Sequence, residues 1–408
     1  MSRSRPRILY ICPAWPHDKT YGGQLRALHV GRALKQIGDV RLVVVNAAPE
    51  TPDAIERTSA EFDLAATIKG ASPLTRGLRD RLDWALNPRC ENVHGCLASP
   101  AEMDRLEALL AESDLVWFLK LRSANLLNRW HWPRSVMDID DLPSVFAQAQ
   151  RQAAPAISER LHATLHSWIY RRREKLLLER FGVLAVCSAQ DRQRLGFSDR
   201  VHIIPNGFAR PAHTPQPKLH FPPRLGFMGL YSYLPNFDGV RWFVDNCWPL
   251  VKRELPDARL RLVGAESDGP LKPADASVDG LGWVADPAAE IATWSAMIVP
   301  IHTGAGTRIK IADAFSRRCP VVSTRFGAYG YDVEHGKQLL LADDPFAFAQ
   351  ACIRLIRDSR YARRIADTAW DDFLHRWTWD AIAPSIHDAA YDCLRRSATR
   401  SSSVHSFS

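Results

Sequence analysis

Short apolar runs alternate with longer helical patterns along most of this chain, and this alternation constrains the fold more than any other feature. In the first half, apolar runs rich in β-branched residues fall at 8–12, 40–46, 115–119, 135–139, 183–187 and 201–204. The second half repeats the pattern at 224–229, 258–264, 296–301, 320–323 and 338–341. Strands that alternate with helices form parallel sheets covered by helices on both faces. The sequence therefore predicts an α/β fold with two Rossmann-like domains.

A proline-rich stretch separates the two alternations. It follows the motif I-P-N-G-F and carries five prolines, which exclude a helix or a central strand. We therefore expect an N-terminal domain at 1–205, a linker at 206–223 and a C-terminal domain at 224–379. A helix at 380–396 is expected to pack back on the N-terminal domain. The polar tail at 397–408 is expected to be disordered, because it has too little apolar surface to offset the entropy of ordering.

Composition excludes several classes of protein. No apolar run reaches the ~18 residues that a membrane-spanning helix needs. The apolar run near the N-terminus stops at Pro13, too early for a secretory signal peptide. The eight cysteines include no C-x-x-C pair and no spacing with histidine that is typical of zinc sites. We therefore expect a cytoplasmic protein without a disulfide framework or a metal site.

The formal net charge of +8 leaves the partner open. A basic surface suits nucleic acid, anionic lipid headgroups or a phosphorylated small molecule, and it equally serves solubility alone. Nothing besides the charge favours nucleic acid, so none is expected as a partner.

One glycine-containing loop follows the first predicted strand. Gly22 and Gly23 stand where the chain enters a helix, and the free amides of a helix N-terminus attract phosphate or a sugar hydroxyl. Arg26, one turn later, would add a cation on the same side. An ordinary turn into a helix explains the two glycines equally well.

A second loop, H-T-G-A-G-T-R-I-K, follows the predicted strand at 296–301. Gly304 and Gly306 let the backbone approach a ligand, and Thr307 is a suitable N-cap. Arg308 and Lys310 can supply charge for a diphosphate. The loop is neither a P-loop nor a G-x-G-x-x-G dinucleotide fingerprint, which argues against an NTPase and a nicotinamide enzyme.

Acidic residues stand near the ends of two predicted elements. Asp313 follows the second loop by about one helical turn, where it could bind ribose hydroxyls or belong to a solvated helix face. Asp138, Asp140 and Asp141 follow a strand of the first half, where a catalytic or sugar-binding carboxylate would lie. Acids at a strand end also serve as turn formers and helix caps, so both interpretations stay open.

The motifs, in this order, resemble the retaining glycosyltransferases of family four. They are G-G-Q-L-R-A, I-P-N-G-F, M-G-L-Y-S-Y-L-P-N-F-D-G-V-R-W-F, P-D-A-R-L-R-L-V-G, G-A-G-T-R-I-K-I-A-D-A, P-V-V-S-T and H-G-K-Q-L-L-L-A-D-D-P. The resemblance implies the GT-B architecture, in which two Rossmann-like domains face each other across a cleft. It also implies transfer of a sugar from a nucleotide diphosphate sugar, bound by the second domain, to a glycan or lipid-linked acceptor, bound by the first. Bacterial polysaccharide assembly is the setting that the family suggests.

The chain departs from the family pattern at several positions. Asp313 stands where the family usually has the second glutamate of a Glu–seven residues–Glu pattern, and Ala305 stands at the first. Tyr329 replaces a commonly observed glutamate. Asn236 lies near the position of a lysine that many members carry. These departures leave open a catalytically silent subunit for binding or assembly.

The resemblance also implies a mechanism. The leaving phosphate would help to deprotonate the acceptor on the face from which it departs, so that no protein nucleophile, metal or cofactor is required. Arg308 and Lys310 are then the candidates for stabilising the diphosphate. Asp140 or Asp141 aligns with the region where many members place an acceptor-side histidine. Tyr329 is grouped with the donor-binding residues.

Two basic amphipathic segments, at 74–86 and 165–181, lie in the expected acceptor domain. Arginines beside Trp, Leu and Tyr could rest on anionic lipid at the inner face of the plasma membrane, which would suit a lipid-linked acceptor. Packing of their apolar faces on the sheet, with solvated arginines, explains the pattern equally well.

Overall fold

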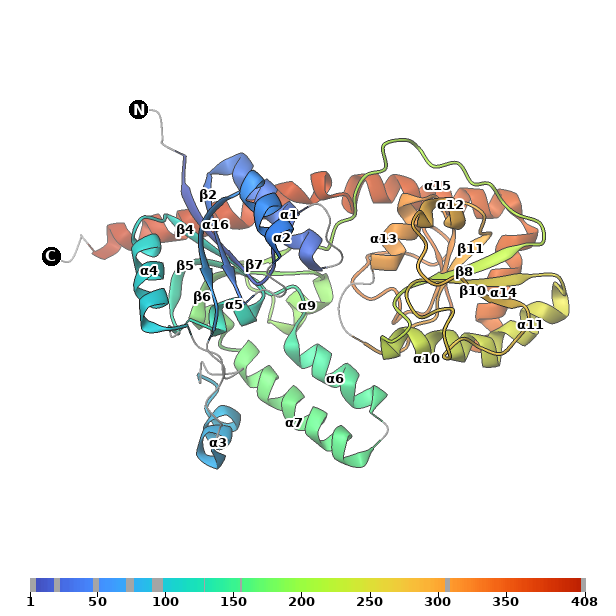
Figure 1. The fold of residues 1–408 in the computed structure, drawn as a ribbon, viewed down its shortest axis with the longest axis horizontal. Coiled ribbons are helices and arrows are strands. Elements are labelled where there is room, and N and C mark those ends of the chain that lie inside the picture. The colour runs from blue at the N-terminus through green and yellow to red at the C-terminus, as the bar shows by residue number, and fades with distance from the viewer. Residues whose placement is uncertain are drawn as a thin grey trace. The chain divides into compact units, whose positions relative to one another are not determined.

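The computed structural model describes residues 5–17, 23–46, 51–70, 77–89, 98–127, 129–154, 156–304 and 309–404. The chain divides into two compact units. The N-terminal unit comprises Met1–Gln148, Leu161–Pro205 and Ile382–Ser408, and the C-terminal unit comprises Ala149–Arg160 and Asn206–Ala381. Each unit is built on one parallel sheet (Figure 1), so the predicted α/β fold with two Rossmann-like sandwiches is confirmed.

The N-terminal sheet has seven strands in the order β3-β2-β1-β4-β5-β6-β7. The strands are β1(Arg7–Cys12), β2(Asp39–Val45), β3(Asp63–Ile68), β4(Leu115–Leu119), β5(Trp132–Asp138), β6(Phe181–Val186) and β7(Val201–Ile203). Neighbouring strands pair in parallel, with Ile8 opposite Val40 and Leu115. The central strands are apolar throughout because helices cover both faces of the sheet (Figure 1).

The helices of this unit follow the alternation. They are α1(Gly23–Ile37), α2(Pro52–Glu61), α3(Leu78–Leu86), α4(Pro100–Ala111), α5(Leu121–Asn125), α6(Pro143–Ala153), α7(Ile157–Glu174), α8(Leu177–Arg180) and α9(Ala189–Arg194). The end of α6 and the start of α7 fall in Ala149–Arg160, which contacts group with the C-terminal unit. The start of α4 shows why a helix begins there. Ser99 caps the backbone amide of Glu102, and the Glu102 side chain accepts in return from the Ser99 amide, with Pro100 in the first turn.

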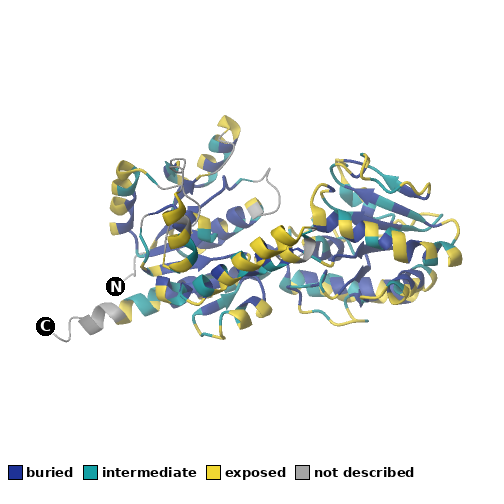
Figure 2. Cartoon of the chain, turned by 90° about the horizontal axis from the view of Figure 1, so that it is seen from below, coloured by how far each residue is buried: buried dark blue, intermediate teal, exposed yellow. Residues whose placement is uncertain are grey.

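The C-terminal sheet has six strands in the order β10-β9-β8-β11-β12-β13. The strands are β8(Arg224–Met228), β9(Arg259–Val263), β10(Val278–Gly280), β11(Ala296–Val299), β12(Val321–Ser323) and β13(Leu340–Leu341). The helical segments are α10(Leu234–Trp242), η1(Phe243–Cys247), α11(Trp248–Glu254), α12(Pro287–Ile291), α13(Ile309–Ser316), α14(Pro345–Arg357) and α15(Ser359–Arg376). Buried residues concentrate on the strands of both sheets and the helix faces turned toward them (Figure 2).

The helical stretch Leu234–Glu254 is interrupted by a π-helical turn, η1, between α10 and α11. Pro249 stands in the first turn of α11 and has no amide hydrogen to donate to the carbonyl four residues earlier. In the π-helical turn the backbone hydrogen bonds join residues five apart instead of four, so the bond that Pro249 cannot donate is not required.

The last helix, α16(Trp379–Val404), differs from expectation. It continues to Val404, so the expectation of disorder from residue 397 is wrong as far as Val404, and 405–408 lie outside the described residues. Contacts group Ile382–Ser408 with the N-terminal unit, where the His387 side chain meets the Ala33 carbonyl oxygen at 3.0 Å.

Across the part of the chain that the structure describes, no helix combines the length and the apolar character needed to cross a bilayer.

We predict that Gly239→Ala destabilises the C-terminal unit. A Cβ at Gly239 in α10 would lie 2.5 Å from the carbonyl oxygen of Pro300, the residue that follows β11. Relieving this overlap requires a backbone shift, which should lower the free energy of unfolding by about 1–3 kcal/mol. Gly77→Ala is the matched control, because a Cβ there has no neighbour within 4 Å among the residues that the structure describes. Equal urea midpoints for the two variants would contradict the prediction.

Candidate functional site

The carboxyl ends of β8 and β9 approach each other closely in the C-terminal unit. Gly229 follows β8 and Gly264 follows β9, with a φ of +126° at Gly264. A Cβ at Gly264 would lie only 2.2 Å from the Gly229 carbonyl oxygen. Glycine is therefore required here, and the two loops expose bare backbone at the strand ends. In open parallel sheets, ligands bind at this edge.

Lys310 of α13 places its ammonium group above this bare backbone. A Cβ at Gly229 would lie 3.0 Å from Lys310 Nζ and 2.7 Å from Asn236 Nδ2, so the two nitrogens border the same point. Asn236 donates from Nδ2 to the Leu230 carbonyl at 2.7 Å, and Lys310 Nζ lies 5.4 Å from the Phe227 ring centre. The family resemblance implies that Asn236 lies near the position of a lysine that many members carry. The structure brings the charge of Lys310 to that place from another element.

The glycine loop after β11 is only partly described. Gly304 is buried and has a φ of +112°, a conformation that favours glycine. Gly306, Thr307 and Arg308 lie outside the described residues, as does Ala305. Their predicted roles stay predictions. In the N-terminal loop, Gly22 is also outside the described residues, and Gly23 is the first residue of α1.

Asp313 lies in α13, one turn after Lys310, and is 1 % exposed. Its Oδ1 accepts a hydrogen bond from Arg317 Nε at 2.8 Å. Its Oδ2 is buried and meets no hydrogen-bond donor among the described residues. Burial raises the pKa of Asp313 above its ordinary value, whereas the charge of Arg317 acts in the opposite direction. An unsatisfied buried carboxylate oxygen costs stability, so it has to be explained by something besides packing.

Tyr329 lies in the turn that follows β12, at the same edge of the sheet. The turn is held by Thr324, whose amide donates to the Val299 carbonyl at 3.2 Å, and the Tyr329 ring stacks on Phe326. Two residues later, the Tyr331 hydroxyl accepts a hydrogen bond from the Ala312 amide at 3.2 Å. The turn containing Tyr329 is thus fastened to both β11 and α13.

The N-terminal unit gathers charged groups at the carboxyl ends of β4, β5 and β6. Lys120 Nζ lies 3.1 Å from Asp140 Oδ2, and the Cys187 thiol donates to Asp140 Oδ1 at 3.3 Å. Burial raises the pKa of Cys187 well above its usual range, so the thiol remains a donor. Lys120 and Asp140 have φ values of +64° and +65°, which are unfavourable for residues with a Cβ. Strained backbone of this kind concentrates at functional sites.

Lys120 is a candidate that sequence reasoning missed. Its signal was a single lysine directly after the fully buried strand β4. Asp140 is buried beside it, whereas Asp141, the next residue, is exposed and lines a pocket of about 340 Å³ between α5, α6, α7 and α8. The structure therefore separates two candidates that the sequence could not tell apart.

Arg26 corrects a prediction. It was expected to present a cation beside the first glycine loop, but its side chain is fully buried and paired with Asp138, which is also fully buried. Nη2 donates to Asp138 Oδ1 at 2.7 Å and Nε to Oδ2 at 3.0 Å. The same guanidinium also donates to the carbonyls of Ile204 at 3.0 Å and Pro205 at 3.2 Å. Arg26 thus joins α1, β5 and the end of β7.

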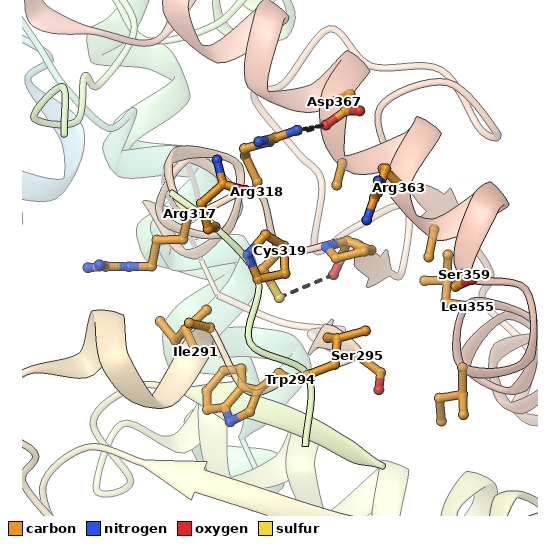
Figure 3. A pocket seen from close by; sticks show the side chains of 18 residues that line it. Ile291, Trp294, Ser295, Arg317, Arg318, Cys319, Leu355, Ser359, Arg363 and Asp367 are labelled. Atoms are coloured by element: carbon orange, nitrogen blue, oxygen red, sulfur yellow. Dashed lines mark hydrogen bonds and ion pairs between the residues drawn. The ribbon is translucent and has the colours of Figure 1, made fainter. Parts of the chain in front are cut away.

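A pocket of about 190 Å³ in the C-terminal unit lies away from these groups (Figure 3). Its lining residues Ser295 and Pro320 directly precede β11 and β12, so the pocket is at the amino ends of the strands. Arg318, on its rim, is paired with Asp367 (Figure 3). This position is opposite the glycine loops, so the pocket belongs to neither candidate site.

Within the described residues, no group of three or more His, Cys, Asp or Glu side chains is arranged to hold a metal ion.

Residues 222–358 match the model of the family Glycosyl transferases group 1. The match lies within the C-terminal unit. The matched range contains β8 to α14, and therefore Gly229, Gly264, Lys310 and Asp313.

Solved structures show the fold of the whole chain. Sucrose-phosphate synthase from Thermosynechococcus elongatus is similar with a TM-score of 0.62 and 17% identity, over 94% of this chain and 98% of that one. HepE from Anabaena, solved in complex with UDP and glucose, is similar with a TM-score of 0.56 and 16% identity, again over 94% and 98%. The predicted GT-B fold is confirmed.

A curated relative matches a smaller region. It is described as an uncharacterized 44.6 kDa protein in the cps region of Klebsiella pneumoniae, and it is 30% identical over 170 residues. The match covers 39% of this chain and 44% of that protein, less than half of the relative's length.

We predict that Arg26→Met destabilises this GT-B chain strongly. The substitution leaves the Asp138 carboxylate buried without its partner, which should cost about 3–5 kcal/mol in the free energy of unfolding. Arg41→Met is the control, because Arg41 forms an exposed ion pair with Glu112 that should contribute about 0–1 kcal/mol. Urea unfolding followed by circular dichroism measures both. Arg26→Lys keeps the charge but loses the contact through two nitrogen atoms. Its loss in the free energy of unfolding should lie between the losses of the two Met variants. A loss for Arg26→Met no larger than for Arg41→Met would contradict the importance of the pair.

Proposed function

We propose that this chain is a retaining glycosyltransferase that moves a sugar from a nucleotide diphosphate sugar to a glycan or lipid-linked acceptor in bacterial polysaccharide assembly. The observation that carries the proposal is the ammonium group of Lys310 beside the bare backbone of Gly229, against which Gly264 packs. A cation at glycine-lined strand ends suits a diphosphate, because the backbone can approach the phosphate oxygens and the charge can neutralise them.

Donor binding would use the groups around α13. Lys310 and the amides of the glycine loop would contact the diphosphate, with Arg308 as a further cation. Asp313 would accept hydrogen bonds from the ribose hydroxyls through Oδ2, the oxygen that meets no donor among the described residues. A hydroxyl donor there would remove the cost of the unsatisfied oxygen. Tyr329 would border the same donor.

Acceptor binding would use the group at the carboxyl ends of β4 and β5. Asp140 would orient the attacking hydroxyl, with Asp141 as the neighbouring candidate, and Lys120 would hold the Asp140 carboxylate in place. The leaving phosphate oxygen would take the proton of the hydroxyl on the face from which it departs, giving retention. Stabilising the departing diphosphate by Lys310 would then be the dominant catalytic effect, with no metal or cofactor in the scheme.

Two relatives support this proposal in outline. HepE was solved with UDP and glucose, the parts of a nucleotide sugar, and the Klebsiella pneumoniae relative is encoded in a cps region. We extend from these to a cytoplasmic enzyme that acts at the inner face of the plasma membrane.

A donor screen tests the activity directly. The purified chain is incubated with UDP-, GDP-, ADP- and dTDP-sugars, and release of the nucleoside diphosphate is measured with and without lipid-linked or glycan acceptors. Release from one donor supports the proposal, and the anomeric configuration of the product by NMR tests retention. Binding of a donor without any release would favour a catalytically silent subunit, in which Ala305 and Tyr329 mark lost catalysis.

We predict that Asp313→Asn weakens donor binding without lowering stability. The variant replaces a carboxylate by a neutral amide of the same size, and loss of charged hydrogen bonds to ribose should raise the Kd about ten- to a hundredfold. The pKa of Asp313 is raised in the folded chain, so its ionised form costs stability as pH rises through the window above the unfolded value. The variant should therefore have an equal or higher Tm at neutral pH.

Calorimetry with the donor found in the screen measures the Kd of the Asp313→Asn variant, and thermal unfolding measures its Tm. Asp245→Asn is the control, because Asp245 forms an exposed pair with Arg241 in another helix. Unchanged donor affinity in Asp313→Asn would remove Asp313 from the donor site.

We also predict that Lys120→Met lowers kcat about a hundredfold, because Asp140 loses the cation that positions it. Lys120→Arg retains the charge and should restore much of the rate. Donor Kd by calorimetry should stay unchanged in both variants. A parallel loss of donor affinity, or a rate unaffected by Lys120→Met, would contradict a positioning role on the acceptor side.

A further inference from the structure

A pocket of about 390 Å³ lies beside the helical segment α10–η1 of the C-terminal unit. Four residues at helical spacing on this segment line it: Phe237, Arg241, Val244 and Asp245. Part of the remaining wall comes from the crossover between β9 and β10, whose residues 264–277 are all described and form no helix. The crossover contributes Leu271, Pro273, Ala274 and Asp275. The volume lies in the range of about 300–1,000 Å³ that is typical of small-molecule sites.

Tyr231 gives this pocket an unsatisfied polar group. The residue lines the pocket and is only 1% exposed. Its hydroxyl is buried and finds no hydrogen-bond partner in the described part of the chain. Burial raises the pKa of Tyr231, so the hydroxyl keeps its proton. An unsatisfied buried hydroxyl costs free energy, and a polar group of a ligand in the adjoining pocket would remove that cost.

The charged groups of the pocket favour a neutral ligand. Arg241 lies 3.6 Å from Asp245, so the guanidinium group already faces a carboxylate. Asp275 accepts hydrogen bonds at Oδ1 from the Ser277 amide at 2.7 Å and from the Ser277 hydroxyl at 2.5 Å. The bond from that hydroxyl lowers the pKa of Asp275, which therefore stays ionised at neutral pH. Two carboxylates against one guanidinium group repel phosphates and other anions but accept hydrogen bonds from hydroxyl groups.

The walls between these groups are apolar. Phe237, Leu271 and Pro273 line the pocket, and the Tyr231 ring packs edge-on against Phe237 with ring centres 6.4 Å apart. Apolar walls with hydroxyl acceptors at their edge suit a ring that has C–H groups on its faces and hydroxyl groups around its rim. A sugar ring has this chemistry. An entirely apolar molecule would leave the Tyr231 hydroxyl without a partner.

The pocket lies next to the candidate donor site but does not share its charged group. Tyr231 comes two residues after Gly229, and Phe237 directly follows Asn236. Asn236 and Lys310 both border Gly229, whereas none of these three residues lines the pocket. A ligand in the pocket would therefore leave Gly229 and Lys310 free for a diphosphate.

We infer that this pocket binds one neutral sugar unit of a glycan, at a second binding point beside the site of sugar transfer. Assigning the sugar to a glycan substrate rests on the proposed function, whereas the sugar chemistry of the pocket does not. The ring packs on Phe237 and Leu271, Asp275 accepts hydrogen bonds from its hydroxyl groups, and the Tyr231 hydroxyl donates to one of its oxygens.

Titrations of the full chain followed by NMR test the ligand class. The neutral probes are the methyl glycosides of glucose, galactose, mannose and N-acetylglucosamine. Glucuronic acid and glucose 6-phosphate add a negative charge, and cyclohexanol supplies an apolar ring with one hydroxyl group. We expect at least one neutral glycoside to bind about tenfold more tightly than the charged sugars and cyclohexanol. Equal binding of a charged sugar or of cyclohexanol, or no binding of any neutral glycoside, would overturn the inference.

A matched pair of variants locates the binding. Ala274 is an exposed lining residue, so Ala274→Trp should fill the pocket and weaken binding of the glycoside at least about tenfold. Ala276→Trp is the control, because Ala276 is exposed in the same crossover and does not line the pocket. Equal affinity in the two variants would place the sugar elsewhere and overturn the inference.

Tyr231→Phe tests the hydroxyl group alone. The variant keeps the ring and removes an unsatisfied polar atom, so its Tm should be equal or higher while the Kd of the glycoside rises about fivefold. Tyr391→Phe, at an exposed tyrosine of α16, is the control and should change neither quantity. An unchanged Kd in Tyr231→Phe would contradict the contact that we assign to this hydroxyl.

Donor affinity, measured on the same samples, reports the proposed function separately. It depends on the groups around Lys310 and Asp313, which do not line the pocket. Glycoside binding by a chain that neither binds nor cleaves a nucleotide sugar would support the pocket and reject the proposed function. Donor cleavage by a chain whose glycoside affinity is unaffected by Ala274→Trp would do the reverse.

Discussion

The buried pair of Arg26 and Asp138 organises the carboxyl edge of the N-terminal sheet. One guanidinium group joins α1 to the last residue of β5 and to the carbonyls that follow β7, with both side chains fully buried. Burial raises the pKa of Asp138, and the Arg26 charge opposes that shift. Such a pair is a weak source of net stability but is costly to break. Its effect is positional, since it fixes the strand end two residues before Asp140.

In the C-terminal unit, glycines rather than an ion pair set the arrangement of the strand ends at the carboxyl edge of the sheet. Gly264 and Gly229 allow two strand ends to come closer than any side chain would permit, and Lys310 lies over the surface that they leave. Because glycine has no side chain, the backbone here leaves its amide groups exposed and leaves room for a ligand at the same point. An ion pair thus fixes the carboxyl edge of the N-terminal sheet, whereas glycines shape the same edge of the C-terminal sheet. Lys120 lies at the first edge and Lys310 at the second.

The sequence was sufficient for the fold and for one part of the site. Short continuous apolar runs predict the strands well because both faces of each parallel sheet are buried. The glycine loop and the family resemblance single out Asp313. The sequence did not predict that Arg26 is buried, because its burial depends on Asp138, a partner 112 residues away. Nor could it find Lys120 or the place of the Lys310 ammonium, since both depend on how loops turn at strand ends. The helix beyond residue 396 was missed because its stability comes from continuing a packed helix, not from its own composition.

Ion pairs account for the cations beside the pocket at the amino ends of the C-terminal strands. On the amino side of the C-terminal sheet, Arg317 and Arg318 are bound to Asp313 and Asp367, so those cations already serve the fold. The pair with Arg317 uses only one oxygen of Asp313, and the other oxygen meets no donor among the described residues. An unsatisfied buried oxygen costs free energy that folding alone does not offset. A hydroxyl donor on that oxygen, as proposed for the ribose of the donor, would remove this cost.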